Sequence, residues 1–264
     1  MVTGWEFERR VHFDEIVVNY DKARPEYPSK LFADIFNYAS GKKALEIGAG
    51  TGKATKPFLD AGYDVTAVEM GANMADFLRA KFKNLNVIVS TFEEAELDDT
   101  YDLIYAANAI HWVDAEIGLP KIFRLLKNGG VCALFRYNGV PDDGEELYEE
   151  IQAIYEKHYR TYYQESERPY KDVYGNPEQI LYRFGCKELS DYGFSDISMK
   201  LYDAVIPYTA EEYIELLETL ADHRSLPDEN KKLLYTNIKE AIIRHGGILN
   251  AGHTYQLYMG RKII

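Results

Sequence analysis

The stretch Lys43-Ala-Leu-Glu-Ile-Gly-Ala-Gly-Thr-Gly52 decides the fold. Its first half is a short apolar run, and its second half carries glycine at alternate positions, 48, 50 and 52. A helical pattern follows over residues 53–61, so the stretch predicts a strand, a tight turn and a helix. Glycine at such a turn lets a ligand approach backbone amides at the N-terminus of the helix.

The alternation of strand and helix patterns continues beyond this unit. Strands are expected over residues 64–68, 86–89, 101–106 and 131–135, and helices over residues 73–82 and 119–126. The alternation predicts an α/β fold, a doubly wound, mainly parallel seven-stranded sheet with helices on both faces and a helical lid or insertion. Residues 204–207 and 254–264 are expected to add late strands in antiparallel pairs.

Four segments follow expected strands and so meet at one rim of this sheet. They are residues 48–52, Glu69, residues 91–93 and residues 108–112. Ligands of open α/β sheets bind beyond the carboxyl ends of the strands. The sequence therefore predicts a binding site at this rim.

Two acidic residues narrow the choice of ligand. Glu46 lies two residues before Gly48, and we expect its carboxylate to point into the ligand space, where it would repel a phosphate and attract a cation. Glu69 closes the second expected strand, where an acidic side chain accepts hydrogen bonds from ribose hydroxyls. S-adenosylmethionine, which carries an ammonium, a sulfonium and no phosphate, suits this pair better than a dinucleotide. Taken singly, either carboxylate could be a solvated surface charge.

Composition limits the partners and the compartment. The formal net charge of −13 disfavours a nucleic-acid partner, which needs clustered Lys and Arg. The two cysteines lie far apart without zinc-like spacing, which predicts a reducing compartment and no metal site, and Cys132 is expected to be a buried hydrophobe. Residues 1–10 lack the apolar core of a signal peptide, and no apolar run reaches membrane-spanning length. We therefore expect a soluble cytoplasmic protein with no membrane partner.

The motifs resemble those of a known family. Residues 44–52 and 65–70 resemble the first two motifs of class I S-adenosylmethionine-dependent methyltransferases. Residues 20–28 and 106–114 resemble small-molecule members related to trans-aconitate methyltransferases, so the likeness covers most of residues 15–137. It implies S-adenosyl-L-methionine as the cofactor and a small-molecule acceptor.

The resemblance also implies roles for individual residues. Cofactor-binding positions would be Tyr20, Arg24, Glu46, Gly48, Ala49, Gly50, Gly52, Glu69, Met70, Thr91, Phe92, Glu93, Asn108 and Ala109. Within this set, Glu46 and Gly48 would line the methionine end, Glu69 would hold the ribose, and residues 91–93 would border the adenine ring and its amino group. Acceptor-binding positions would be Tyr27, Trp112 and Arg136. Residues 20–28 fold over the cofactor in relatives, although an extended, proline-stiffened entry into the next helix also explains Arg24-Pro-Glu-Tyr-Pro28.

The expected domain organisation has four parts. Residues 1–40 would form an N-terminal cap segment, residues 41–140 the cofactor-binding Rossmann-like core, residues 141–200 a helical lid or substrate insertion, and residues 201–264 the strands and helices that complete the sheet. Helices are expected over 145–164 and 210–219, with a loop around 169–177. Tyrosines in the first helix are spaced so that several lie on one face, and packing of that face onto the sheet is favoured over a roof above the acceptor: Tyr155, Tyr159, Tyr162 and Tyr163.

The function expected is methyl transfer to an oxygen or nitrogen of a small molecule by in-line displacement. His111 could act as a general base for a hydroxyl or amine acceptor, or could be a loop histidine bonded to backbone. A carboxylate acceptor would need Arg or Tyr donors instead. The alternatives are a non-catalytic cofactor-binding module and a nicotinamide-dependent oxidoreductase. The sequence does not identify the acceptor or the oligomeric state.

Overall fold

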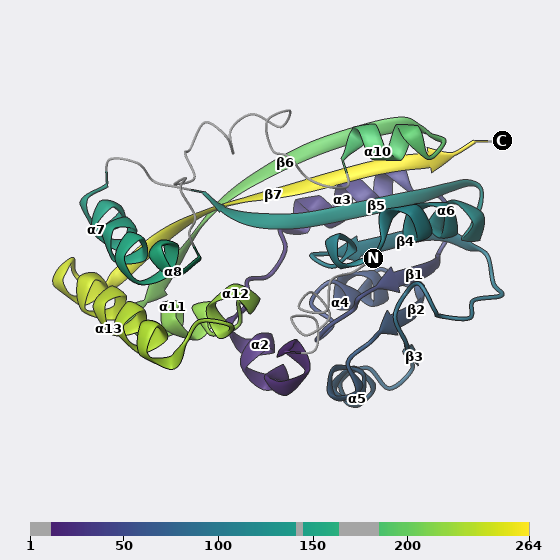
Figure 1. Ribbon diagram of the computed structural model, residues 1–264. Coiled ribbons are helices and arrows are strands. Elements are labelled where there is room, and N and C mark those ends of the chain that lie inside the picture. Colours follow the sequence, from purple (N-terminus) through teal and green to yellow (C-terminus); the bar gives the residue numbers. More distant parts are fainter. Residues whose placement is uncertain (1–11, 141–144, 164–184, 264) are drawn as a thin grey trace.

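The computed structural model describes residues 12–140, 145–163 and 185–263, and these form a sheet of seven strands in the order β3-β2-β1-β4-β5-β7-β6 (Figure 1). The strands are β1 (Lys43–Ile47), β2 (Asp64–Glu69), β3 (Asn86–Val89), β4 (Tyr101–Ala107), β5 (Leu126–Val140), β6 (Phe194–Thr209) and β7 (Ile248–Lys262). Strands β1 to β5 pair in parallel. Strand β7 is antiparallel to both β5 and β6. The fold expected from the sequence is confirmed.

The structure contains helices that were not expected from the sequence, and β5 and β6 are longer than the expected strands 131–135 and 204–207. The helices are η1 (His12–Glu15), α2 (Val17–Ala23), α3 (Ser29–Tyr38), α4 (Thr55–Asp60), α5 (Ala72–Lys81), η2 (Ile110–Trp112), α6 (Ala115–Leu125), α7 (Glu146–Tyr155), η3 (Glu156–Arg160), α8 (Thr161–Tyr163), α10 (Cys186–Asp191), α11 (Ala210–Leu217), α12 (Ala221–Arg224) and α13 (Asp228–Arg244). No helix was expected at α13. None of the described helices is long and apolar enough to cross a membrane.

Each face of the sheet has its own hydrophobic core, because successive side chains of a strand point to opposite faces. Leu45 and Ile47 of β1 face one core together with α6 and α10, whereas Ala44 faces the other with α3, α4 and α5. All three side chains are buried. Cys132 is buried in the first core, as expected, and both cysteines are free thiols. Helices therefore cover both faces of the sheet.

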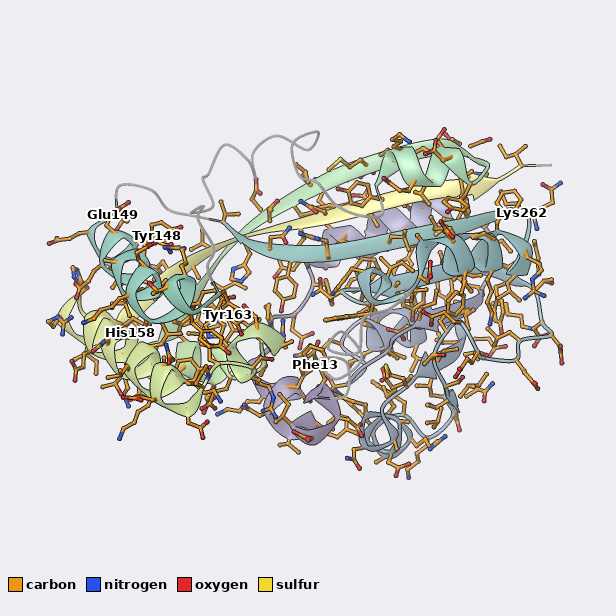
Figure 2. The ribbon with its side chains drawn as sticks, in the orientation of Figure 1. Phe13, Tyr148, Glu149, His158, Tyr163 and Lys262 are labelled. Carbon is orange, nitrogen blue, oxygen red and sulfur yellow. The ribbon has the colours of Figure 1, made fainter. Side chains whose placement is uncertain are left out.

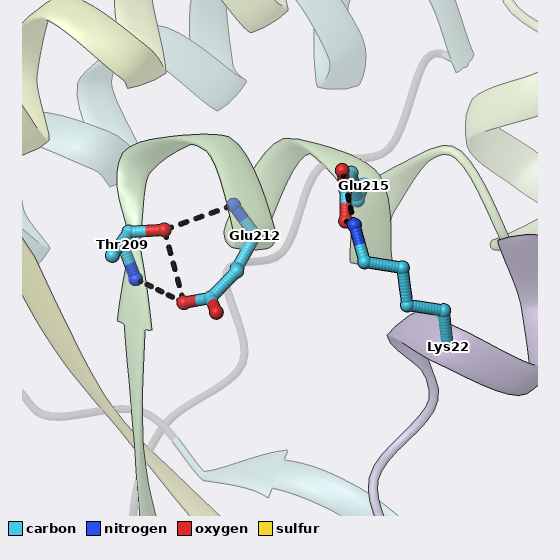
Figure 3. Close-up of polar contacts among 4 residues, drawn as sticks. All are labelled: Lys22, Thr209, Glu212 and Glu215. Carbon is cyan, nitrogen blue, oxygen red and sulfur yellow. Dashed lines mark hydrogen bonds and ion pairs between the residues drawn. The ribbon is translucent and has the colours of Figure 1, made fainter.

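A third core lies beyond the sheet, where helices α7, α11 and α13 gather around the twisted ends of β6 and β7 (Figure 1). Helix α11 begins at a capping box in which Glu212 N donates to Thr209 Oγ1 at 3.2 Å and Thr209 N donates to the Glu212 carboxylate at 2.8 Å (Figure 3). Glu215 of the same helix pairs with Lys22 of α2 at 2.7 Å (Figure 3). This ion pair is exposed, so it contributes little to stability, although it shows where α2 and α11 meet.

The expected lid over residues 141–200 lies partly outside the described residues, which omit 141–144 and 164–184 and with them the loop around 169–177. Its described helices α7 and η3 pack against α13. Three tyrosines of this segment contact α12: Tyr155 Oη lies 3.2 Å from His223 Nε2, Tyr159 donates to the Asp222 carboxylate, and Tyr163 Oη donates to the Asp222 carbonyl. Tyr155, Tyr159 and Tyr163 pack in the third core, which also includes Leu249 of β7, so packing of the aromatic face onto the sheet stays a prediction.

Candidate functional site

A cavity of about 720 Å³ opens at the carboxyl ends of β1, β2, β4 and β5. The segments expected to meet at this rim do meet, because the strands that precede them are parallel neighbours. The expected site residues that line the cavity are Tyr20, Arg24, Gly48, Gly50, Glu69, Met70, Thr91, Phe92, Glu93, Asn108, Ala109, His111, Trp112 and Arg136. The remaining four, Tyr27, Glu46, Ala49 and Gly52, are not in its lining.

The glycine turn after β1 needs glycine for three different reasons. Gly48, Gly50 and Gly52 have φ of 67°, 55° and 81°, in the left-handed region. A Cβ on Gly48 would lie 2.6 Å from the Cβ of Ala109, whereas a Cβ on Gly50 would meet nothing within 4 Å and so would occupy open space beside the cavity. A Cβ on Gly52 would collide with Phe82 at 2.4 Å, so this glycine serves the packing of the turn on α5.

We expect Gly48→Ala to lower the free energy of unfolding by about 1 kcal/mol more than Gly62→Ala does, because it adds overpacking against Ala109 to left-handed strain. Gly62 is the matched control, since it has φ of 78° and open space around its missing Cβ. Urea denaturation of both variants measures the difference. Equal losses of the free energy of unfolding in the two variants would mean that the close contact between residues 48 and 109 relaxes without an energetic cost.

Glu69 is the carboxylate that the structure brings to the cavity. Its Oε2 accepts from Gly50 N at 2.8 Å and its Oε1 accepts from Gly71 N at 2.9 Å. The side chain is 8% exposed, and burial raises the pKa of its carboxyl above the ordinary value. Because each carboxylate oxygen has two lone pairs, Glu69 can hold the turn and still accept hydrogen bonds from a ligand.

Glu46 lies under the turn, where its position corrects the expectation from the sequence. The carboxylate is buried and absent from the cavity lining, and its Oε2 accepts from Thr55 Oγ1 at 2.6 Å and from Tyr105 Oη at 3.0 Å. Its Oε1 is buried with no hydrogen-bond partner. Burial raises the pKa of the Glu46 carboxyl to about 8, so the ligand-free group is mostly protonated at neutral pH. Glu69, and not Glu46, is therefore the carboxylate that can attract a cationic ligand in the cavity.

Arg24 joins the N-terminal segment to two other parts of the chain. Its Nη1 donates to Tyr137 Oη at 3.0 Å and its Nη2 donates to the Thr219 carbonyl at 2.7 Å. The guanidinium lies 5.0 Å above the ring of Tyr20, and its buried Nε has no hydrogen-bond partner. A cation whose Nε–H has no partner therefore lines the same cavity as the glycine turn.

Tyr27 lies away from the main cavity, among aromatic rings. Its ring centroid is 5.1 Å from Phe135 and 6.0 Å from Tyr255, both in edge-to-face geometry. With Ala49 it lines a separate cavity of about 40 Å³. This position favours packing of the N-terminal segment over contact with an acceptor.

Aromatic side chains cover the cavity from the N-terminal side. Phe13 of η1 lies edge-to-face with Trp112 at 6.2 Å and with Tyr20 at 5.7 Å between ring centroids. Figure 2 labels Phe13 between the sheet and α2. Next to it, Asp14 Oδ1 accepts from Met74 N at 2.8 Å at the start of α5. Neither residue was predicted from the sequence, because the contacts of Phe13 with Trp112 and of Asp14 with Met74 join distant parts of the chain and leave no local motif.

The segment after β4 brings Asn108 and His111 to the cavity, and the His111 ring lies 4.9 Å from that of Trp112 between centroids. Asn108 has φ of 49°, which asparagine tolerates better than most residues, and its Oδ1 accepts from Tyr137 N at 3.1 Å. His111 follows in η2 and lines the cavity. Arg136 lines it from β5 and donates to the side chain of Asn138. These polar groups surround the end of the cavity nearest the sheet.

A second cavity, of about 600 Å³, lies between the third core and the ends of β5 and β7. It shares Gly139 and Asp222 with the first cavity. Tyr155 and Tyr159 line it, and His223 has a buried Nδ1 with no hydrogen-bond partner. Helix α12 therefore borders both cavities, a role that was not predicted from the sequence for residues 220–222. In the described part of the chain, no group of three or more His, Cys, Asp or Glu could hold a metal ion.

Comparisons with known proteins agree with this geometry. Residues 45–134 match the family model described as a methyltransferase domain. An uncharacterized methyltransferase of Mycobacterium tuberculosis is 38% identical over 123 residues, which are 46% of this chain and 50% of the relative. The chain thus spans about half the length of this curated relative. The malonyl-[acyl-carrier protein] O-methyltransferase of Acetivibrio thermocellus is 26% identical over 96% of this chain and 93% of its own.

Solved structures share the fold. A putative type II methyltransferase from Anaeromyxobacter dehalogenans matches with a TM-score of 0.60 and 19% identity over 91% of this chain and 98% of its own. Phosphoethanolamine N-methyltransferase 2 of Haemonchus contortus, solved with phosphomonomethylethanolamine and S-adenosylhomocysteine, matches with a TM-score of 0.55 and 17% identity over 100% of this chain and 61% of its own. The comparisons support a class I S-adenosylmethionine-dependent methyltransferase, and they do not single out the trans-aconitate branch.

Proposed function

We propose that this protein is a class I S-adenosylmethionine-dependent methyltransferase that acts on an oxygen or nitrogen of a small molecule. The observation that carries the proposal is the meeting of Glu69 and the glycine turn in one cavity at the carboxyl edge of the sheet. The match of residues 45–134 to a methyltransferase domain supports it independently. Such a site suits a nucleoside that carries a positive charge and no phosphate.

The cavity residues fit this cofactor. Open space at Gly50 leaves room beside the backbone, and Glu69 has lone pairs for two ribose hydroxyls. The partnerless Nε of Arg24 can donate to the carboxylate of a bound amino acid. When bound, S-adenosylmethionine supplies the methyl group on a sulfonium whose charge disappears as the methyl leaves.

The remaining cavity residues would orient the acceptor and exclude water. Phe13, Tyr20 and Trp112 form an aromatic wall, which favours a transfer step in which charge disappears. His111 would take the proton of a hydroxyl or amine acceptor, and Arg136 would orient a carboxylate acceptor. The second cavity, which shares the lining residues Gly139 and Asp222 with the first, would hold the outer part of an acceptor. The division of the chain into a cap segment, a core, a lid and completing strands and helices is part of the same proposal.

A transfer assay tests the proposal. Purified protein is incubated with methyl-labelled S-adenosylmethionine and panels of small carboxylic acids, amines and alcohols, and labelled product and S-adenosylhomocysteine are measured. We expect acceptor-dependent release of S-adenosylhomocysteine matched by labelled product. Cofactor binding without transfer to any acceptor would favour the non-catalytic module. Reduction or oxidation of the same compounds in a parallel incubation with a nicotinamide cofactor would favour the oxidoreductase. Trp112 and His111 line the same cavity as Glu69, which favours chemistry over the module.

A further inference from the structure

Lys121 of α6 is a buried lysine that the proposed reaction does not use. The residue is 8% exposed, and its Nζ donates to three backbone carbonyls, those of Phe92 at 2.7 Å, Glu93 at 3.2 Å and Ala95 at 2.6 Å. An ammonium has three N–H donors, so these carbonyls engage all of them. The residues it holds form the turn after β3, of which Phe92 and Glu93 line the cavity.

A second contact ties the same turn to α6. The Glu93 carboxylate accepts from Asp114 N at 3.1 Å, and Asp114 caps α6 by accepting from Glu116 N at 3.0 Å. The turn is therefore attached to both the N-terminus and the middle of the helix. Lys121 also lies 5.1 Å from the centre of the Phe92 ring, which keeps the ammonium close to the turn.

The direction of these carbonyls fixes the direction of the amides in the turn. In a trans peptide the carbonyl and the following N–H point opposite ways, and the described residues contain no cis peptide. Because the Phe92 carbonyl points at Lys121, the Glu93 N–H points away from it. A backbone N–H held in one direction donates well to an acceptor nitrogen of a purine and poorly to a ring N–H.

We propose that Lys121 is a positioning residue for purine recognition: by holding the carbonyls of residues 92, 93 and 95, it fixes the turn that distinguishes adenine from other purines. The inference rests on the proposed function, because it takes the adenine of the cofactor to lie beside residues 91–93. Lys121 acts through this turn and touches no reacting atom.

The test compares S-adenosylhomocysteine with S-inosylhomocysteine, whose purine carries a carbonyl oxygen in place of the amino group and a proton on N1. Calorimetry gives the dissociation constant of each for the wild type and for Lys121→Met, which keeps much of the side-chain volume without the donors. We expect the wild type to prefer S-adenosylhomocysteine, and the variant to lose about tenfold of that preference, the value of one hydrogen bond.

Lys262→Met is the matched control. Lys262 is also 8% exposed and donates to backbone carbonyls of Arg124 and Leu126, at the other end of α6. Figure 2 shows Lys262 at the far end of the sheet from Phe13, which lines the cavity. We expect this variant to lower the melting temperature and to keep the wild-type preference. If Lys121→Met does not fold, the same measurement is made with Lys121→Gln.

Unchanged preference in a folded Lys121 variant, or equal affinity of the wild type for both compounds, would overturn the inference and leave the proposed function in place. Failure of the wild type to bind S-adenosylhomocysteine would instead overturn the proposed function, and the inference with it. The ratio of the two dissociation constants separates the cases, because a general loss of stability lowers both affinities together.

Discussion

Glu69→Ala is expected to weaken S-adenosylhomocysteine binding by about 5-fold to 150-fold, which corresponds to about 1–3 kcal/mol. The substitution removes the acceptor proposed for the ribose hydroxyls. It also leaves the N–H groups of Gly50 and Gly71 without their carboxylate partner, so the turn loses the contacts that fix it. Calorimetric titration of the purified variant measures the loss.

Two controls make this result specific. Glu69→Gln keeps the shape and one acceptor oxygen, so its affinity should lie between those of the wild type and the alanine variant. Glu94→Ala removes an exposed carboxylate from the neighbouring turn, outside the cavity lining, and should bind as the wild type does. Wild-type affinity in Glu69→Ala would show that the ribose lies elsewhere.

Glu46→Gln is expected to stabilise the protein increasingly as the pH rises. The Glu46 carboxyl has a pKa of about 8 in the folded chain against an ordinary value of 4.5, so between these values the folded state binds more protons than the unfolded state. The free energy of unfolding of the wild type therefore falls as the pH rises through this window. At 1.36 kcal/mol per pKa unit, this loss in the free energy of unfolding of the wild type reaches about 3–5 kcal/mol by about pH 8.

The comparison of variant and wild type isolates this group, because the other titrating residues are common to both proteins. Glutamine can still accept from Thr55 and Tyr105 and carries no charge to bury. Urea denaturation at about pH 5 and at about pH 8 should give a small difference in the free energy of unfolding at the lower pH and a large one at the higher. A difference that does not depend on pH would mean that Glu46 ionises normally in the folded chain.

Much of the fold follows from local patterns. The bounds of β1 and β3 match the expected strands 43–47 and 86–89, because short β-branched or apolar runs bounded by turn residues have few other structures open to them. The location of the site was also predictable, because a parallel sheet places the carboxyl ends of its strands at one edge. Helix α13 was missed although Leu234, Ile238 and Ile242 have helical spacing in the sequence.

The parts of the site that escaped prediction depend on three-dimensional packing. Glu46 is a strand residue, so its side chain points to a face of the sheet, and α4 with Thr55 covers that face. Glu69 ends its strand, where the backbone of the turn can reach it. Phe13 and residues 220–222 reach the cavity from distant parts of the chain, and no spacing in the sequence relates them to the glycine turn.

The central claim is that the cavity beside Glu69 and the glycine turn accepts a cationic amino-acid nucleoside and not a dinucleotide. Isothermal titration calorimetry of the wild-type protein with S-adenosylmethionine, S-adenosylhomocysteine and NAD tests this claim most directly. Our account predicts saturable binding of the first two at one site per chain and no binding of NAD. Binding of NAD, with neither of the others bound at millimolar concentration, would contradict it.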